Sequence, residues 1–245
     1  MTDERYREQA EAEVQCDELR IAEGNLLEAL PDAVPPCMIY QGDRLTAEQA
    51  GRMTALYSET ELLSVSGLLE LERGRKEERE VALIGEALAI SEAVLTAVPG
   101  FLRAGITERE LAAVIDFRQR IEGADGSAFE TIVAFGENAA RPHARPGDRT
   151  LQPGDCVLVD TGCRVAGFVS DITRNFFFGA PSETYIGVYE VVRRALEASV
   201  AAASEGMIAR DLDYAGRNII DSAGFGGQFS HSLGHGVGLE IHEWP

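Results

Sequence analysis

The sequence predicts an α+β fold in which helices pack on a mostly antiparallel sheet. The observations behind this prediction are the order of the elements and one hairpin. Two helical patterns precede a group of β-rich segments, two more helical patterns follow it, and the β-rich group contains a hairpin pattern over residues 156–174. The repeated order indicates an internal duplication whose second half lacks its final strands.

The first part of the chain carries the weakest pattern. Charged, helix-compatible sequence runs to about residue 30, and three prolines interrupt it at residues 31–36. A helix is expected after Thr46, and a short strand at 62–65. Since no chemical motif appears before a charge-rich connection, we expect residues 1–72 to be a shortened N-terminal region and residues 73–245 to be the main domain.

Helical periodicity becomes clear at Glu78. Apolar residues at helical spacing predict a helix from Glu78 that ends at Pro99 and Gly100. A second helix is expected to begin at Thr107, where Glu110 stands three residues later as in a capping box. These two helices should lead directly into the β-rich segments.

Two more helices are expected after the hairpin. A long helix should follow Pro181, and another should span 211–223 and end at Gly224. The apolar face of the long helix consists of Ile186, Tyr189, Val192, Leu196 and Val200. This spacing is typical of an amphipathic helix.

The hairpin over residues 156–174 holds the first candidate site. With Val165 and Ala166 as its two-residue turn, Asp160 would lie directly opposite Asp171, with Cβ atoms about 4.5–5.5 Å apart on one face of the sheet. Two carboxylates this close repel each other unless one is protonated or a cation lies between them. The pair suits a divalent ion, or two ions about 3.5–4 Å apart. The alternative is a register slipped by one residue, with both carboxylates solvated on loops.

Composition limits the classes of partner. The 245 residues carry a net charge of -19 and a single lysine, so the surface should repel nucleic acid and anionic membranes. Neither an apolar run of about 18 residues nor a signal peptide is present, which predicts a cytoplasmic protein without a membrane helix. The four cysteines lack a disulfide or CxxC pattern, and we expect them to be buried, reduced thiols.

The four histidines all lie beside Gly- or Pro-rich sequence. They are His143, His231, His235 and His242. Residues 231–235 have the spacing of a helical zinc motif, but a serine replaces the glutamate and two glycines disfavour a helix. These glycines instead indicate that the backbone approaches a ligand closely. Neither a complete dinucleotide fingerprint nor a nucleophilic-serine motif is present.

Three segments in this order resemble the M24 family of metallopeptidases, which has the pita-bread fold. They are FETIVAFGENAARPHARPGD, VLVDTGCRVAGFVSDITR and HSLGHGVGLEIHEWP. The resemblance covers roughly residues 71–245 and is greatest for the branch of Xaa-Pro aminopeptidases and prolidases. It implies a pita-bread (creatinase/aminopeptidase-like) fold, with an antiparallel sheet that is covered by helices and lacks its final strands.

The resemblance also implies the roles of six residues. The implied metal ligands are Asp160, Asp171 and His235. The implied catalytic histidines are His143, His231 and His242. The first and last of these match histidines that contact the substrate and help to stabilise the tetrahedral intermediate. The middle one matches the additional histidine of the Xaa-Pro branch, which implies a small proline-containing peptide as substrate.

The implied cofactor is a pair of divalent metal ions, commonly manganese, with cobalt, zinc or iron as alternatives. The ions would lower the pKa of a bridging water and polarise the scissile carbonyl. The family pattern needs two further glutamates on strands after the last motif, and Glu240 and Glu243 do not match them. We therefore expect an incomplete metallo-exopeptidase that is weak or inactive by itself, with a strand at 237–241 left as an exposed sheet edge. A homodimer is compatible with these expectations.

Two other functions are compatible with the same fold. One is a non-catalytic pita-bread binding module, and the other is a non-peptidase enzyme such as a dimethylsulfoniopropionate lyase. The retained aspartate pair and the four histidines favour the peptidase. The aspartate pair also counts against a creatinase, because creatinase works without metal and lacks this pair.

Overall fold

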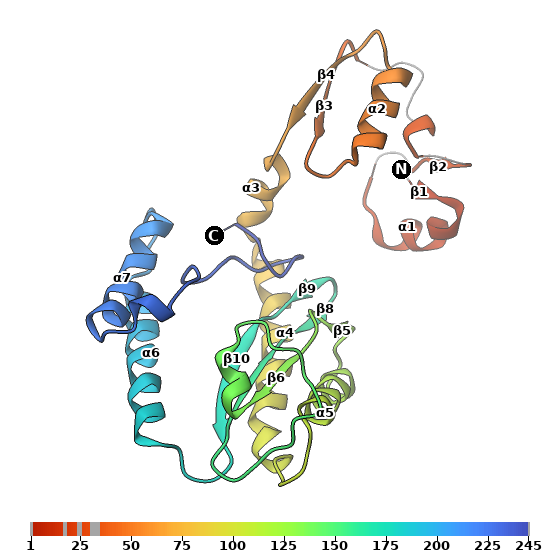
Figure 1. Ribbon diagram of the computed structural model, residues 1–245. Helices are drawn as coiled ribbons and strands as arrows, with labels where there is room; N and C mark the ends of the chain where they lie inside the picture. The colour runs from red at the N-terminus through yellow and green to blue at the C-terminus, as the bar shows by residue number, and fades with distance from the viewer. Residues whose placement is uncertain (1, 17–18, 24–25, 30–34, 245) are drawn as a thin grey trace. The chain divides into compact units, whose positions relative to one another are not determined.

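The computed structural model describes residues 2–16, 19–23, 26–29 and 35–244. These residues form two compact units that divide between Glu72 and Arg73 (Figure 1). The proline-interrupted stretch falls partly at residues 30–34, which lie outside the described residues.

The smaller unit contains two parallel strands that are connected by a helix. Strands β3 (Cys37–Gln41) and β4 (Glu61–Val65) pair in parallel, and helix α2 (Ala47–Leu56) makes the connection that parallel strands need. The helix after Thr46 and the strand at 62–65 are therefore confirmed. The remaining elements of this unit are β1 (Thr2–Asp3), η1 (Glu4–Tyr6), α1 (Arg7–Glu13), β2 (Ile21–Ala22) and η2 (Leu26–Ala29).

The larger unit has the helices that the periodicity predicts. They are α4 (Glu78–Ala97), α5 (Glu108–Ile121), α6 (Glu183–Ala202) and α7 (Ala209–Ser222). The structure adds the short 3-10 helices η3 (Val98–Gly100) and η5 (Gly226–Gln228), which no pattern predicted, and α3 (Leu68–Gly74) crosses the boundary between the units. The capping box of α5 is present, because Thr107 Oγ1 accepts from the amide of Glu110 and Glu110 accepts from the amide of Thr107. Gly224 follows α7 with a φ of 85°, as a C-terminal cap requires.

Two antiparallel sheets form the centre of the larger unit. The first has the strand order β10 (Ile172–Phe177), β7 (Cys156–Thr161), β6 (Ile132–Phe135). The second has the order β5 (Gly126–Ser127), β8 (Cys163–Val165), β9 (Phe168–Val169). Helices α4 and α5 pack against these strands (Figure 1). The α+β arrangement predicted from the sequence is confirmed in this unit.

The core of the larger unit lies between α4, α5 and the first sheet. Its buried side chains include Val94, Leu95, Leu111, Ile115, Val133, Phe135, Val157 and Val159. By length and composition alone, Glu78–Gly100 could cross a membrane, although the sequence predicts no membrane helix. In the structure α4 contributes Val94 and Leu95 to the core, and 28% of its apolar window is buried.

Helices α6 and α7 run side by side as a helical hairpin (Figure 1). They pack on each other through Val191, Ala195 and Ile220. The apolar face predicted for α6 is not the face that they bury, since Leu196 is 61% exposed and Val200 is 67% exposed. The helix itself is confirmed, but among the described residues this apolar row stays uncovered.

The hairpin turn lies one residue later than the sequence analysis placed it. Ala166 and Gly167 occupy it with φ values of 48° and 89°, the positive pair of a type I′ turn. Asp160 is therefore paired with Thr173, and the predicted direct opposition to Asp171 is wrong. Because Asp171 lies two residues from Thr173, it still shares the face of Asp160 as a diagonal neighbour.

The cysteine prediction is correct for two of the four residues. Cys156 and Cys163 are buried and free, whereas Cys16 and Cys37 are free but exposed. The buried pair lies in the hairpin strands, where packing against the helices excludes water. The exposed pair lies in the smaller unit, whose sequence carries the weakest pattern.

Candidate functional site

The hairpin is distorted beside Asp171. Cys163 and Ser170 are opposed, but the amide of Cys163 donates to the Ser170 side chain (3.1 Å), while the Ser170 amide donates to the Cys163 carbonyl (3.0 Å). A Cβ on Gly162 would lie 1.8 Å from the carbonyl oxygen of Ser170. Glycine is therefore required at this position, because any side chain would push the strand carrying Asp171 away.

A buried polar network supports the hairpin from the face opposite the aspartates. Ser91 Oγ of α4 lies 2.9 Å from Ser170 Oγ, and Gln119 Nε2 of α5 donates to Thr161 Oγ1 (3.0 Å). Thr131 Oγ1 lies 2.9 Å from the same Thr161 oxygen. Successive strand residues point to opposite faces of a sheet. Contacts that hold Thr161 and Ser170 on one face therefore direct the neighbouring Asp160 and Asp171 to the other face.

The two aspartates interact electrostatically. Asp160 accepts a hydrogen bond from Thr173 Oγ1 at 2.8 Å, which orients its carboxylate. Burial raises the pKa of Asp171, and the negative charge of Asp160 raises it further, against smaller opposing effects of His235 and His242. The pair thus forms a concentration of negative charge that a cation or a proton would relieve.

His235 brings a nitrogen donor to this carboxylate pair. Its Nε2 lies 3.4 Å from Oδ2 of Asp171, and its Nδ1 lies 2.9 Å from the carbonyl oxygen of Gly236. A proton on Nδ1 shared with that carbonyl leaves the Nε2 lone pair directed at Asp171. The ring of His242 packs against that of His235, with 4.2 Å between centroids and 61° between planes.

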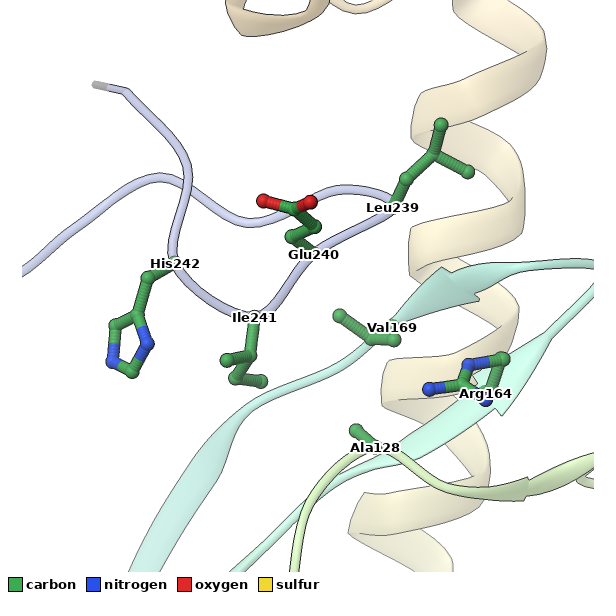
Figure 2. A pocket seen from close by; sticks show the side chains of 7 residues that line it. All are labelled: Ala128, Arg164, Val169, Leu239, Glu240, Ile241 and His242. Atoms are coloured by element: carbon green, nitrogen blue, oxygen red, sulfur yellow. The ribbon is translucent and has the colours of Figure 1, made fainter. Parts of the chain in front are cut away.

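An open pocket of about 370 Å³ adjoins this group. Its lining residues are Ala128, Arg164, Val169, Leu239, Glu240, Ile241 and His242 (Figure 2). Figure 2 shows Ile241 of the terminal segment pointing toward Val169 of β9, with His242 beside it. The pocket therefore combines an apolar wall with an imidazole at one edge.

The other two histidines do not join the group. His231 Nδ1 lies 2.7 Å from the carbonyl oxygen of Ser232, and the His231 ring packs on Phe229 at 4.7 Å between centroids. Its loop is held by Arg217, which donates to the carbonyl oxygen of His231 at 2.8 Å. His143 is exposed in the loop after η4 (Gly136–Ala140), and within the described part of the chain it makes no hydrogen bond, ion pair or ring contact.

The glycines of the last motif accommodate the chain itself. A Cβ on Gly236 would lie 2.2 Å from the carbonyl oxygen of Trp244, and one on Gly238 would lie 2.5 Å from the Glu243 carboxylate. For Gly236, the predicted close approach of a ligand is not supported, because the chain itself fills that space, whereas a Cβ on Gly234 would meet nothing within 4 Å and the prediction for that residue stays a prediction. The predicted strand at 237–241 is also wrong, because a single bridge between Gly236 and Glu243 closes a turn there.

The ligand types at Asp171 are ones that a divalent cation accepts. Carboxylate oxygens and an imidazole nitrogen are ligands that manganese, cobalt, zinc and iron accept. Asp171 contacts Asp160 and His235 pairwise. Over residues 2–16, 19–23, 26–29 and 35–244, however, no three His, Cys, Asp or Glu side chains meet closely enough to hold an ion. Among the described residues, the donors at Asp171 therefore fall short of the three that would hold an ion.

Sequence reasoning missed the residues that support this group. Gly162, Ser170 and Thr173 flank the aspartates, and the only available signal was their small size or hydroxyl group beside a carboxylate. Glu243 does not match a metal ligand of the family pattern, and no local pattern in the sequence indicates its contacts with the distant Arg73 and Lys76.

The chain has relatives among known peptidases. Residues 82–245 match the metallopeptidase family M24. The Xaa-Pro dipeptidase of Pyrococcus horikoshii is 41% identical over 170 residues, which are 69% of this chain and 48% of that protein. The uncharacterized peptidase YqhT of Bacillus subtilis is 34% identical over 249 aligned residues, which cover 100% of this chain and 70% of that protein.

Solved structures have the same fold over the length of this chain. The Xaa-Pro dipeptidase of Bacillus anthracis superposes with a TM-score of 0.94 at 32% identity, over 99% of this chain and 69% of that one. The X-Pro aminopeptidase of Thermotoga maritima superposes with a TM-score of 0.89 at 33% identity, over 100% of this chain and 70% of that one. The matched part of the chain thus spans about half the length of the Pyrococcus relative and about 70% of these structures. The predicted pita-bread fold is confirmed over the part that this chain spans.

Proposed function

Because the chain belongs to metallopeptidase family M24, we propose that residues 73–245 form the catalytic domain of an Xaa-Pro peptidase and residues 1–72 its shortened N-terminal region. The observation that carries this proposal is the contact of Asp171 with both Asp160 and His235. The substrate is a small peptide whose scissile bond precedes a proline, as the names of the relatives suggest.

Asp160, Asp171 and His235 would hold two divalent ions in part, with manganese as the proposed metal. When bound, the ions supply a water of lowered pKa and polarise the scissile carbonyl. Thr173 holds the Asp160 carboxylate by its hydrogen bond, and Gly236 holds the ring of His235 with Nε2 toward the aspartates. Both contacts reduce the reorganisation that ligand binding would otherwise require.

The histidines outside the ligand set are proposed to act on the peptide. His242 lines the pocket beside His235, where an imidazole donor can stabilise negative charge that develops on the carbonyl oxygen. The apolar pocket wall of Val169 and Ile241 suits a proline ring. The roles of His143 and His231 rest on their places in the motifs, since neither contacts the aspartates in this structure.

Residues 1–245 by themselves are proposed to be a weak metal binder. Three ligands with two negative charges would face two divalent ions, and oxygen-rich sites depend on the number and charge of their ligands. Glu243 is unsuited to complete the set, because it is already paired with Arg73 and Lys76. The relatives are longer than this chain, and we propose that equivalent polypeptide supplies the remaining carboxylates.

The test compares this chain with a version extended by the final strands of the Bacillus anthracis relative. Manganese binding is measured by calorimetry, and turnover is measured on an Xaa-Pro peptide and on a peptide with N-terminal methionine. The extended chain should bind two ions and prefer the Xaa-Pro peptide, and His231→Ala should slow that turnover about 10²-fold. Glu86→Gln, at an exposed carboxylate of α4, serves as the matched control.

Four outcomes would contradict parts of this proposal. Micromolar two-site binding with turnover by residues 1–245 alone would show that their ligand set is sufficient. Faster cleavage of the methionine peptide, or equal Xaa-Pro rates for wild type and His231→Ala, would remove the proline assignment. Metal binding by the extended chain without any peptide cleavage would favour a binding module or a different chemistry on the same fold.

A further inference from the structure

The carboxylate of Glu243 collects four donors although it lies among the last residues of the chain. Arg73 Nη2 approaches it at 2.5 Å and Lys76 Nζ at 2.8 Å. The amides of Leu239 and Glu240 donate to the same carboxylate at 3.0 and 3.1 Å. Its side chain is only 5% exposed. A charge this far from water is retained only where partners compensate its lost hydration, and here they do.

The main chain of Glu243 connects this cluster to the candidate site. Its amide donates to the carbonyl oxygen of Gly236 and its carbonyl accepts from the amide of Gly236, both at 2.9 Å. Gly236 directly follows His235 and accepts from its ring, while His242 directly precedes Glu243. The bridge therefore closes a turn that has one site histidine at each end, and it brings their rings to 4.2 Å.

The turn has two separate anchors. On one side, the carbonyl of Gly238 accepts from the amide of Val169 in β9 at 2.9 Å. On the other side, Arg73 and Lys76 hold Glu243 from the last turn of α3 and the connection to α4. The second anchor lies before residue 82, where the match to the peptidase family begins. Lys76 is also the single lysine of the chain, and its side chain is 14% exposed.

We propose that Glu243 is a positioning residue, through which the segment in front of α4 determines where the rings of His235 and His242 stand. The Glu243 carboxylate stabilises the turn by accepting hydrogen bonds from two of its backbone amides. Arg73 and Lys76 bind the same carboxylate and so hold the turn against the start of the domain. This inference rests on the proposed function only for the roles of the two rings. The ring positions can be measured without any peptidase activity.

The experiment is proton and carbon NMR of the histidine rings in the full metal-free chain at one fixed pH. In the wild type, the short distance between His235 and His242 should give a ring-to-ring nuclear Overhauser effect. Glu243→Gln removes the charge at constant shape, and Lys76→Met removes one cation. Both should abolish that effect and shift both ring signals, while the signal of exposed His143 stays in place.

Matched variants separate a specific contact from a general loss of charge. Lys76→Arg keeps a cationic donor within reach of the carboxylate and should restore the wild-type ring signals. Glu86→Gln removes an exposed carboxylate from α4 and should change none of them. Circular dichroism of each variant establishes that the chain is folded.

The proposal is wrong if folded Glu243→Gln retains the ring-to-ring effect and both ring shifts. If Glu243→Gln does not fold, Lys76→Met decides by the same criterion, because it leaves Glu243 with Arg73 and the two amides. A disturbance that also moves the His143 signal would indicate a general structural role and would overturn the proposal. Failure of the peptidase assays would leave these readings unaffected, so the two proposals fail separately.

Discussion

Replacing Gly162 by alanine tests the distortion that places Asp171. The new Cβ would lie 1.8 Å from the carbonyl oxygen of Ser170 and 2.8 Å from its carbonyl carbon. Both atoms belong to the backbone, so no rotamer change relieves the contact. The φ of Gly162 lies outside the left-handed region, and the penalty is therefore steric and not torsional.

The cost follows from what must move. To restore a normal contact, the strand at Ser170 must retreat by about 1.5 Å, which strains the hydrogen bonds between Ser170 and Cys163. Overpacking costs about 1–3 kcal/mol, and each weakened hydrogen bond adds about 1 kcal/mol. We expect a loss of about 3 kcal/mol in unfolding free energy, together with displacement of Asp171 from Asp160.

Urea unfolding followed by circular dichroism measures this loss. With a denaturant slope of about 2 kcal/mol per molar, the midpoint should fall by about 1.5 M. Gly187→Ala in α6 is the matched control, because its Cβ would meet nothing within 4 Å and alanine favours a helix. A midpoint for Gly162→Ala that equals that of the wild type would refute the steric reasoning.

Three further perturbations have defined outcomes. Ala166→Asn should raise the free energy of unfolding by about 1 kcal/mol, and with it the urea midpoint by about 0.5 M. The reason is that asparagine tolerates the positive φ at this turn position better than alanine. Burial acts to raise the pKa of Glu243, but hydrogen bonds from Lys76, a backbone amide and Arg73 outweigh it and lower that pKa to about 2. A carboxyl whose folded pKa lies below its ordinary value of 4.5 stabilises the fold at pH values above 4.5. About 3 kcal/mol of unfolding free energy should therefore be lost as the pH falls from 4.5 to 2. Over that range, the difference in unfolding free energy between wild type and Glu243→Gln should shrink. Gln119→Ala should cost about 2–4 kcal/mol in the same urea assay, since it empties a fully buried site and removes one hydrogen bond of the Thr161 hydroxyl, which keeps Thr131 as a partner.

The helices of the larger unit could be predicted because their signals are local. The capping box of Thr107 and Glu110 acts over three residues, and the apolar spacing that begins at Glu78 acts over single turns. The environment of a helix face is not local. The row that ends at Val200 has the pattern of a buried face, yet it remains uncovered among the described residues because α7 packs on the neighbouring face.

The hairpin shows how far a pattern can determine geometry. Its existence and the shared face of Asp160 and Asp171 follow from the two-residue period of a strand, and both survive a turn placed one residue too early. The pairing itself depends on which residues adopt positive φ, and alanine at position 166 gives no warning of this. Direct opposition was therefore predicted where the structure has a diagonal pair.

By itself, the sequence of this protein determined its helices, its hairpin and the residue types that meet beside Asp171, because these follow from short-range periodicity and from three ordered motifs. The tertiary structure decided which of those residues approach one another. His235 reaches Asp171, Glu243 reaches Arg73 and Lys76, and His143 remains apart. Such contacts join residues as many as 170 positions apart, and their formation depends on the packing of whole elements, which no local propensity encodes.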